Sequence, residues 1–164
     1  MKRTAIYAGT FDPITLGHMD VVRRGLKLFD QLIIAVAENP KKCPMFDLET
    51  RLNMVRASLM DETNIQVVGF KGLLVDLAHT HGATALLRGL RAASDFEYEF
   101  QMASMNRHLD DRIESVYVMA REDYTFVSSR FIREISSMGG DVSALVPEPV
   151  LHQLHQNITP VDHP

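Results

Sequence analysis

The feature that most constrains the fold is the repeated alternation of short apolar runs with helical patterns. The runs have the length of strands and are rich in Val, Ile or Leu without polar alternation, which indicates strands buried on both faces. They lie at Thr4–Ala8, Leu32–Ala37, Ile65–Phe70, Ala85–Leu87 and Ser115–Met119. Helical patterns occupy residues 16–29, 48–60, 73–81, 95–109, Ser129–Met138 and Glu148–Gln156. This order predicts an α/β fold, a single-domain, Rossmann-like, doubly wound parallel sheet of about five strands with helices on both faces.

Length and composition fit one such domain and disfavour several other classes of protein. The 164 residues are 46% hydrophobic and 23% charged, and we predict one domain over residues 1–158 with a frayed tail at 159–164. The net charge of -4 disfavours a general nucleic-acid or membrane-surface binder. The single cysteine, Cys43, excludes an intramolecular disulfide, and the apolar runs are too short for a signal peptide or a transmembrane helix. We therefore expect a cytoplasmic protein with no nucleic-acid and no membrane partner.

The segment YAGTFDPITLGH, residues 7–18, joins the first predicted strand to the first predicted helix. Parallel sheets place their ligands at such loops. Gly9 permits a sharp turn and a close approach to the backbone, and Pro13 stiffens the loop. Thr15 can cap the helix, whose free N–H groups attract an anion, and a neutral His18 can still donate one hydrogen bond there. A plain helix cap beside a surface histidine is the alternative, and the position after the first strand favours the anion site.

The stretch GTFDPITLGH resembles the signature of the nucleotidyltransferases that carry a T-x-G-H motif. Within that superfamily the chain most resembles the phosphopantetheine adenylyltransferases, bacterial enzymes that make dephospho-coenzyme A, and the resemblance covers nearly the whole chain. Its more specific part is LRGLRAASDFEYEF, residues 87–100, after a predicted strand. Arg88 and Arg91 flank Gly89 there and can bind phosphate oxygens. Without the resemblance, a solvated basic turn paired with the acidic residues of the next helix would be the simpler interpretation.

The resemblance implies a set of site residues. The implied catalytic residues are His18, Thr10, Lys42 and Arg91. The implied phosphopantetheine site consists of Thr10, Lys42, Leu74 and Arg88. The implied ATP site consists of Gly9, Thr10, Phe11, His18, Gly89, Leu90, Arg91, Glu99, Tyr124, Thr125, Phe126, Val127, Ser128, Ser129 and Arg130. Taken alone, Leu74 also fits a core leucine and Ser128 or Ser129 a helix cap, while Arg130 replaces a small hydroxyl residue common in the family.

The implied reaction is direct in-line attack of 4′-phosphopantetheine on ATP, which gives dephospho-coenzyme A and pyrophosphate. The attacking phosphate is ionised at neutral pH, so the chemistry needs alignment of two anions and charge stabilisation rather than a general base. Thr10 would orient the attacking phosphate, and His18 would donate to the α-phosphate. Lys42 and Arg91 would offset the negative charge. Mg²⁺ would be bound mainly through the ATP phosphates, with no metal site on the protein, and the family is typically hexameric and inhibited by coenzyme A.

Two other functions remain open. One is a related nucleotidyltransferase with another phosphate acceptor, such as nicotinamide mononucleotide or glycerol phosphate. The other is a non-catalytic ATP-binding regulatory module, whereas a flavin-type electron carrier is disfavoured by His18 and the arginines.

Some residues outside these motifs have predicted structural positions. The other paired histidines lack the cysteine or carboxylate pattern of a metal site, and we predict surface positions for His79, His81, His152 and His155. Methionine fills irregular gaps, and we predict core positions for Met54, Met60, Met102 and Met105.

Overall fold

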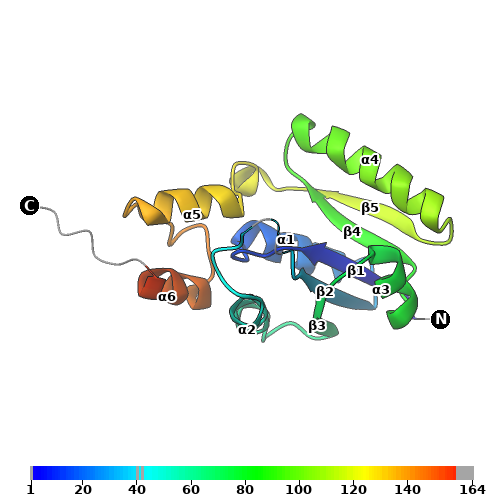
Figure 1. The fold of residues 1–164 in the computed structure, drawn as a ribbon, viewed down its shortest axis with the longest axis horizontal. Helices are drawn as coiled ribbons and strands as arrows, with labels where there is room; N and C mark the ends of the chain where they lie inside the picture. Colours follow the sequence, from blue (N-terminus) through cyan, green and yellow to red (C-terminus); the bar gives the residue numbers. More distant parts are fainter. Residues whose placement is uncertain (1, 40, 42, 158–164) are drawn as a thin grey trace, which may run out of the picture.

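The computed structural model describes residues 2–39, 41 and 43–157 of the chain, so Lys42 and the predicted tail at 159–164 lie outside the described residues. The sheet consists of β1 (Thr4–Gly9), β2 (Gln31–Ala37), β3 (Ile65–Phe70), β4 (Ala85–Leu90) and β5 (Glu114–Met119). All neighbouring strands are parallel, in the order β3-β2-β1-β4-β5 (Figure 1). The predicted fold class is confirmed. The strand order reverses between β1 and β4, where doubly wound sheets bind ligands.

The helices follow the predicted order, and side chains cap the N-termini of α1, α2 and α5. They are α1 (Leu16–Gly25), α2 (Leu48–Ser58), α3 (Leu74–His81), α4 (Ala93–Leu109), the 3₁₀ turn η2 (Glu122–Tyr124), α5 (Ser129–Ser137) and α6 (Glu148–Asn157). Asp47 caps α2 by accepting the N–H of Thr50 at 2.7 Å, and Gly82 ends α3 with a φ of 62°. Figure 1 shows α4 alongside β4 and β5, with α5 and α6 next to each other at the left of the view.

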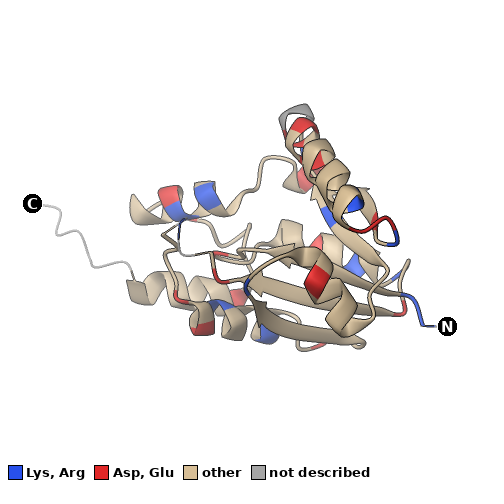
Figure 2. Ribbon diagram, turned by 45° about the vertical axis from the view of Figure 1, so that its right-hand side comes forward, with Lys and Arg blue, Asp and Glu red and all other residues tan. Residues whose placement is uncertain are grey.

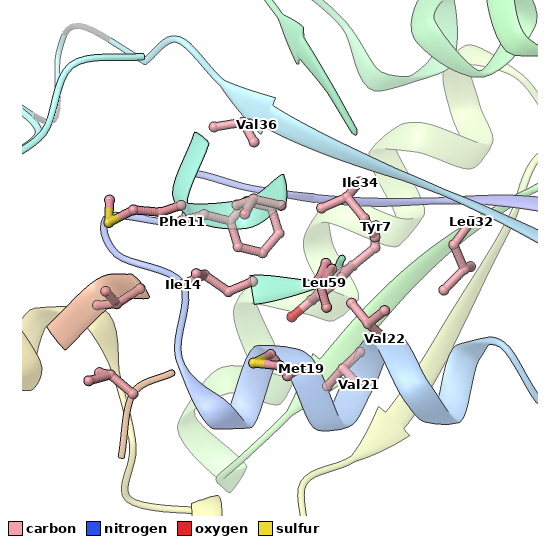
Figure 3. Packing of buried hydrophobic residues seen from close by; sticks show 14 of the residues in the cluster. Tyr7, Phe11, Ile14, Met19, Val21, Val22, Leu32, Ile34, Val36 and Leu59 are labelled. Atoms are coloured by element: carbon pink, nitrogen blue, oxygen red, sulfur yellow. The ribbon is translucent and has the colours of Figure 1, made fainter. Parts of the chain in front are cut away.

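Helices cover both faces of the sheet. Along β1, Ala5 and Tyr7 belong to one buried cluster, and Ile6 and Ala8 belong to another. The first cluster extends into α1, α2, α5 and α6 through Val22, Val55, Ile132 and Leu154. Figure 3 shows its centre, where side chains of α1 meet those of β1 and β2. The second cluster packs on α3 through Val75 and Ala78. Burial on both faces is thus confirmed for the central strands, whereas the edge strands β3 and β5 keep partly exposed side chains.

Two predicted boundaries differ from the structure by three residues or more. Helix α1 ends at Gly25 rather than at residue 29, because the next backbone N–H groups bond three residues back, as in Lys27 N–H to the Arg24 carbonyl at 3.1 Å. Strand β4 continues three residues beyond Leu87, and its Arg88 pairs with Tyr117 of β5. An arginine followed by a glycine does not have the pattern of a buried strand, so the sequence placed Arg88 in the following loop.

The methionine prediction holds for Met54, which is buried, and is wrong for the other three. Met60, Met102 and Met105 expose 78%, 36% and 56% of their surface. Met102 and Met105 lie on α4, whose apolar residues occur around the helix while only part of its surface packs on the sheet, so that Phe96 and Phe100 are also exposed. The prediction of surface positions is confirmed for His79, His152 and His155, which are exposed. His81 is half-buried.

Charged residues are distributed over the helices in both signs. Figure 2 shows acidic and basic residues together on α4 and on α5, while the strands are mostly uncharged. Within residues 2–39, 41 and 43–157, no three His, Cys, Asp or Glu side chains group in a way that could hold a metal ion. Among the helices of this described part, none is long and apolar enough to cross a membrane.

Candidate active site

Two neighbouring cavities open at the carboxyl ends of β1 and β4, where the strand order reverses. The first has a volume of about 430 Å³ and is bounded by residues 10–15 between β1 and α1, which we call the motif loop, by β4 and by the start of α5. The second has a volume of about 300 Å³ and lies toward α3 and α4. Both cavities are lined by Ala8, Gly9, Thr10, Arg88, Tyr98 and Glu99. Thr10 and Arg88 therefore stand at the junction of the two spaces.

Most of the predicted site residues line these cavities. The first is lined by Gly9, Thr10, Phe11, His18, Arg88, Gly89, Arg91, Glu99, Tyr124, Val127, Ser128, Ser129 and Arg130. Leu74 lines the second cavity and not the first. The structure does not place Leu90, Thr125 or Phe126 on either wall. Leu90 is buried in the protein, and Phe126 is 61% exposed.

The motif loop holds His18 through a capping box at the start of α1. The Thr15 hydroxyl accepts the His18 N–H at 3.3 Å, and the Thr15 N–H donates to His18 Nδ1 at 3.0 Å. Because Nδ1 accepts a hydrogen bond, the proton of the neutral ring is on Nε2. The cap predicted at Thr15 is therefore confirmed, and it also leaves Nε2–H as the ring's available donor. Phe11 packs edge-on against the imidazole with ring centroids 5.1 Å apart.

The histidine is uncharged at neutral pH. Burial, together with the guanidiniums of Arg91 and Arg88, lowers the pKa of His18 to about 4. The ring can thus donate a hydrogen bond to a phosphate without a change in its own charge near pH 7.

This pKa predicts a pH dependence of folding stability. The unfolded chain takes up a proton at His18 near pH 6.5 and the folded chain only near pH 4, so stability falls as the pH drops through that interval. Between pH 7.5 and 5 we expect His18 to account for a loss of about 1 to 2 kcal/mol in the free energy of unfolding. Urea denaturation at both pH values should show this excess loss in the parent over His18→Gln. Equal losses of unfolding free energy in the parent and in His18→Gln would contradict the lowered pKa of His18.

Arg88 is oriented by three hydrogen bonds at the junction. Its Nε and Nη2 atoms donate to the two carboxylate oxygens of Glu99 at 3.0 and 2.6 Å, and Nη1 donates to the Ala8 carbonyl at 2.7 Å. Glu99 is buried on α4, and Tyr117 donates its hydroxyl proton to the Glu99 carbonyl at 2.9 Å. Because both planar groups engage in parallel, the guanidinium is held in one direction.

The start of α5 lies over the same cavity. Ser128 caps α5 by accepting the Phe131 N–H at 3.2 Å, which decides between the two serines considered as caps. Ser129 instead donates its hydroxyl proton to the Pro13 carbonyl at 2.7 Å, which joins α5 to the motif loop. Arg91 Nη1 donates to the Val127 carbonyl at 2.9 Å. Two helix N-termini thus converge on one cavity, an arrangement that suits an extended anion.

Comparison with known proteins decides the family. The chain matches a family described as cytidylyltransferase-like over residues 6–135. It is 58% identical over 147 residues to the phosphopantetheine adenylyltransferase of Methylococcus capsulatus, which covers 90% of this chain and 91% of that protein. The chain belongs to the phosphopantetheine adenylyltransferase family. Family members from Thiobacillus denitrificans and Xylella fastidiosa are 51% and 48% identical, covering 94% and 96% of this chain and 97% of each relative.

A solved structure outside this family shows the same fold. A Vibrio parahaemolyticus protein assigned as a nicotinate-nucleotide adenylyltransferase superposes with a TM-score of 0.71, over 96% of this chain and 93% of that one, at 22% sequence identity. At this identity the likeness concerns the fold only. The phosphopantetheine adenylyltransferase relatives share more than twice that fraction of residues, so they determine the family within the fold.

Sequence reasoning missed two charged residues that line the site and one that lies behind it. Asp12 and Arg133 line the first cavity, and Arg133 Nη1 donates to the Asp12 carbonyl at 2.5 Å. Arg51 of α2 is buried behind the motif loop, with 1% of its surface exposed. Asp12 lies within the quoted motif and could have been found there, whereas nothing in the helical pattern of α2 distinguishes Arg51 from a solvated arginine.

Proposed function

We propose that this chain transfers the adenylyl group of ATP to 4′-phosphopantetheine, giving dephospho-coenzyme A and pyrophosphate. The observation that carries the proposal is the pair of cavities that share Thr10 and Arg88, because two phosphorylated substrates must meet at one point. The identity of 48–58% to phosphopantetheine adenylyltransferases supports this choice of substrates.

ATP would occupy the first and larger cavity. Its phosphates would lie between the starts of α1 and α5, where backbone N–H groups and the guanidiniums of Arg91 and Arg130 line the wall. Arg91 Nε forms an ion pair with Asp95 Oδ2 at 3.3 Å, which holds the arginine side chain at the rim of the cavity.

Phosphopantetheine would occupy the second cavity. Its walls carry apolar side chains such as Leu74 and Met102 and polar ones such as Asn106, which suits an arm of amides and methylenes. The phosphate end would reach Thr10 and Arg88 at the junction, close to the α-phosphate of ATP in the first cavity.

In the proposed reaction a phosphate oxygen of phosphopantetheine attacks the α-phosphorus of ATP. A new P–O bond forms, the bond to the β-phosphate oxygen breaks, and pyrophosphate leaves with its electron pair. His18 Nε2–H would donate to the α-phosphate as negative charge accumulates on its oxygens. Arg91 and Lys42 would offset that charge, and Thr10 would orient the attacking phosphate.

Mg²⁺ would enter on the phosphates of ATP. The carboxylates lining the first cavity are already engaged, Asp12 by two backbone N–H groups, Asp95 by Arg91 and Glu99 by Arg88. This donor set suits an ion held by the nucleotide, and it would neutralise part of the triphosphate charge.

The reaction is tested by pyrophosphate release from ATP and Mg²⁺ with parallel acceptors. We expect release with 4′-phosphopantetheine and none with nicotinamide mononucleotide. Release only with the second acceptor would keep the mechanism and discard the substrate. ATP binding without release in either tube would favour a regulatory module.

We also propose that the chain forms a homohexamer in the cytoplasm and that coenzyme A inhibits it, as in the family it resembles. Exposed apolar side chains on α4 and α5 support self-association, among them Phe100, Met105, Phe131 and Ile135. We expect light scattering to give a mass about six times the 18.5 kDa of the chain. A monomer mass at micromolar concentration would contradict this prediction.

A further inference from the structure

Arg51 is a buried arginine whose hydrogen bonds go to backbone carbonyls. Its Nε donates to Phe46 at 3.0 Å, and Nη1 donates to Ala37 at 2.7 Å and to Thr10 at 2.8 Å. Its Nη2 donates to Glu38 at 3.2 Å. Burying a guanidinium is unfavourable unless its N–H groups are paired, and these four carbonyls belong to three separate stretches of chain.

Asp12 of the motif loop binds backbone N–H groups, whereas Arg51 binds backbone carbonyls. Its carboxylate is buried and accepts the N–H of Met45 at 2.8 Å and the N–H of Phe46 at 3.0 Å. Arg133 of α5 donates to the Asp12 carbonyl and lies 3.4 Å from the carboxylate. The charge of the carboxylate thus faces two backbone donors and one guanidinium.

Together these two residues hold both ends of one loop, which we call the 38–46 loop. Arg51 binds the carbonyl of Glu38 at its beginning and that of Phe46 at its end, and Asp12 binds two N–H groups at the same end. Arg51 simultaneously binds the carbonyl of Thr10. The loop is therefore tied directly to the segment that carries Thr10, at the junction of the two cavities.

We propose that Asp12 and Arg51 are positioning residues for adenylyl transfer, which set the 38–46 loop in register with Thr10. The inference rests on the proposed function, because its catalytic meaning comes from Thr10, whose backbone carbonyl accepts a hydrogen bond from Arg51. A misplacement of Thr10 by about 1 Å can lower the rate about 100-fold, and the side chains of Asp12 and Arg51 are both bound to the protein backbone.

Arg51→Lys is the most informative variant. It keeps the positive charge, but an ammonium has three donors on one atom and cannot reach carbonyls that lie around a planar fork. We expect kcat to fall about 100-fold while KM for ATP changes less than about threefold, because the ATP cavity is lined by other residues. Asp12→Asn, which loses one acceptor oxygen, should show a smaller fall in kcat.

Two controls separate positioning from folding. Arg56→Lys makes the same change on an exposed side chain of α2, and Val55→Ala destabilises α2 from within the core and removes no hydrogen bond to the 38–46 loop. Both should keep kcat within about threefold of the parent. A loss of kcat in Val55→Ala as large as in Arg51→Lys, at equal urea midpoints, would overturn the proposal.

Coupling to Thr10 provides the second test. If Arg51 acts by placing Thr10, adding Arg51→Lys to Thr10→Ala should lower kcat less than about threefold further. Fully multiplicative losses would overturn the inference, and so would normal kcat in Arg51→Lys alone. A parent that releases no pyrophosphate would overturn the proposed function instead.

Hydrogen exchange gives a readout that does not depend on turnover. The amides of Met45 and Phe46 donate to Asp12 and should exchange at least about tenfold faster in Arg51→Lys than in the parent, while the amides of β1 stay unchanged. Unchanged exchange at these two amides would overturn the proposal, because the loop would then keep its place without Arg51.

Discussion

His18→Ala is expected to lower kcat about 10²- to 10³-fold, with a much smaller change in KM for ATP. The capping box leaves Nε2–H as the donor of a neutral ring, and that donor gains strength only as charge builds on the α-phosphate. Its loss should therefore weaken transition-state binding more than ground-state binding.

The measurement is steady-state pyrophosphate release with both substrates varied. His155→Ala, an exposed histidine of α6, is the matched control and should behave as the parent. Unfolding by urea would show whether His18→Ala remains folded, since the Thr15 hydroxyl can still cap α1 through its bond to the backbone N–H. A variant within about threefold of the parent kcat would contradict the role given to His18.

Arg88→Leu is expected to lower the free energy of unfolding by about 3–5 kcal/mol. The substitution removes the partner of Glu99, whose side chain is only 9% exposed, and leaves a buried carboxylate without its guanidinium. It also removes a cation from both cavities, so pyrophosphate release should fall even where the protein is still folded. Urea denaturation measures the first effect and the acceptor assay measures the second.

An exposed pair is the natural control. In this pair Nη2 of Arg107 donates to both carboxylate oxygens of Glu114, and the side chains are 64% and 60% exposed, so Arg107→Leu should cost less than about 1 kcal/mol. The double variant Arg88→Leu/Glu99→Leu removes the unpaired charge and should regain much of the stability without regaining activity. If the double variant were as unstable as Arg88→Leu, the buried charge would not be the cause.

The elements of this chain could be predicted where hydrophobic pattern and capping chemistry agree. Each predicted strand lies within a strand of the structure, and Thr15 and Asp47 cap the helices that follow them. The predictions failed where a tertiary contact opposes the local pattern. Strand β4 continues through Arg88 to Leu90 because these residues pair with β5. Met105 is exposed because only part of the surface of α4 packs against the sheet.

The sequence by itself determined the fold class, the motif loop and the family, because buried strands, helix caps and the RGLR segment are local patterns. Only the tertiary structure decided that Arg88 pairs with Glu99 between two cavities, and that Asp12 and Arg51 join the 38–46 loop to Thr10. These contacts depend on where separate βα units bring their ends together. A charged side chain that becomes buried must be paired with an opposite charge or with hydrogen-bonding groups. No local sequence pattern predicts which charged residues will be buried.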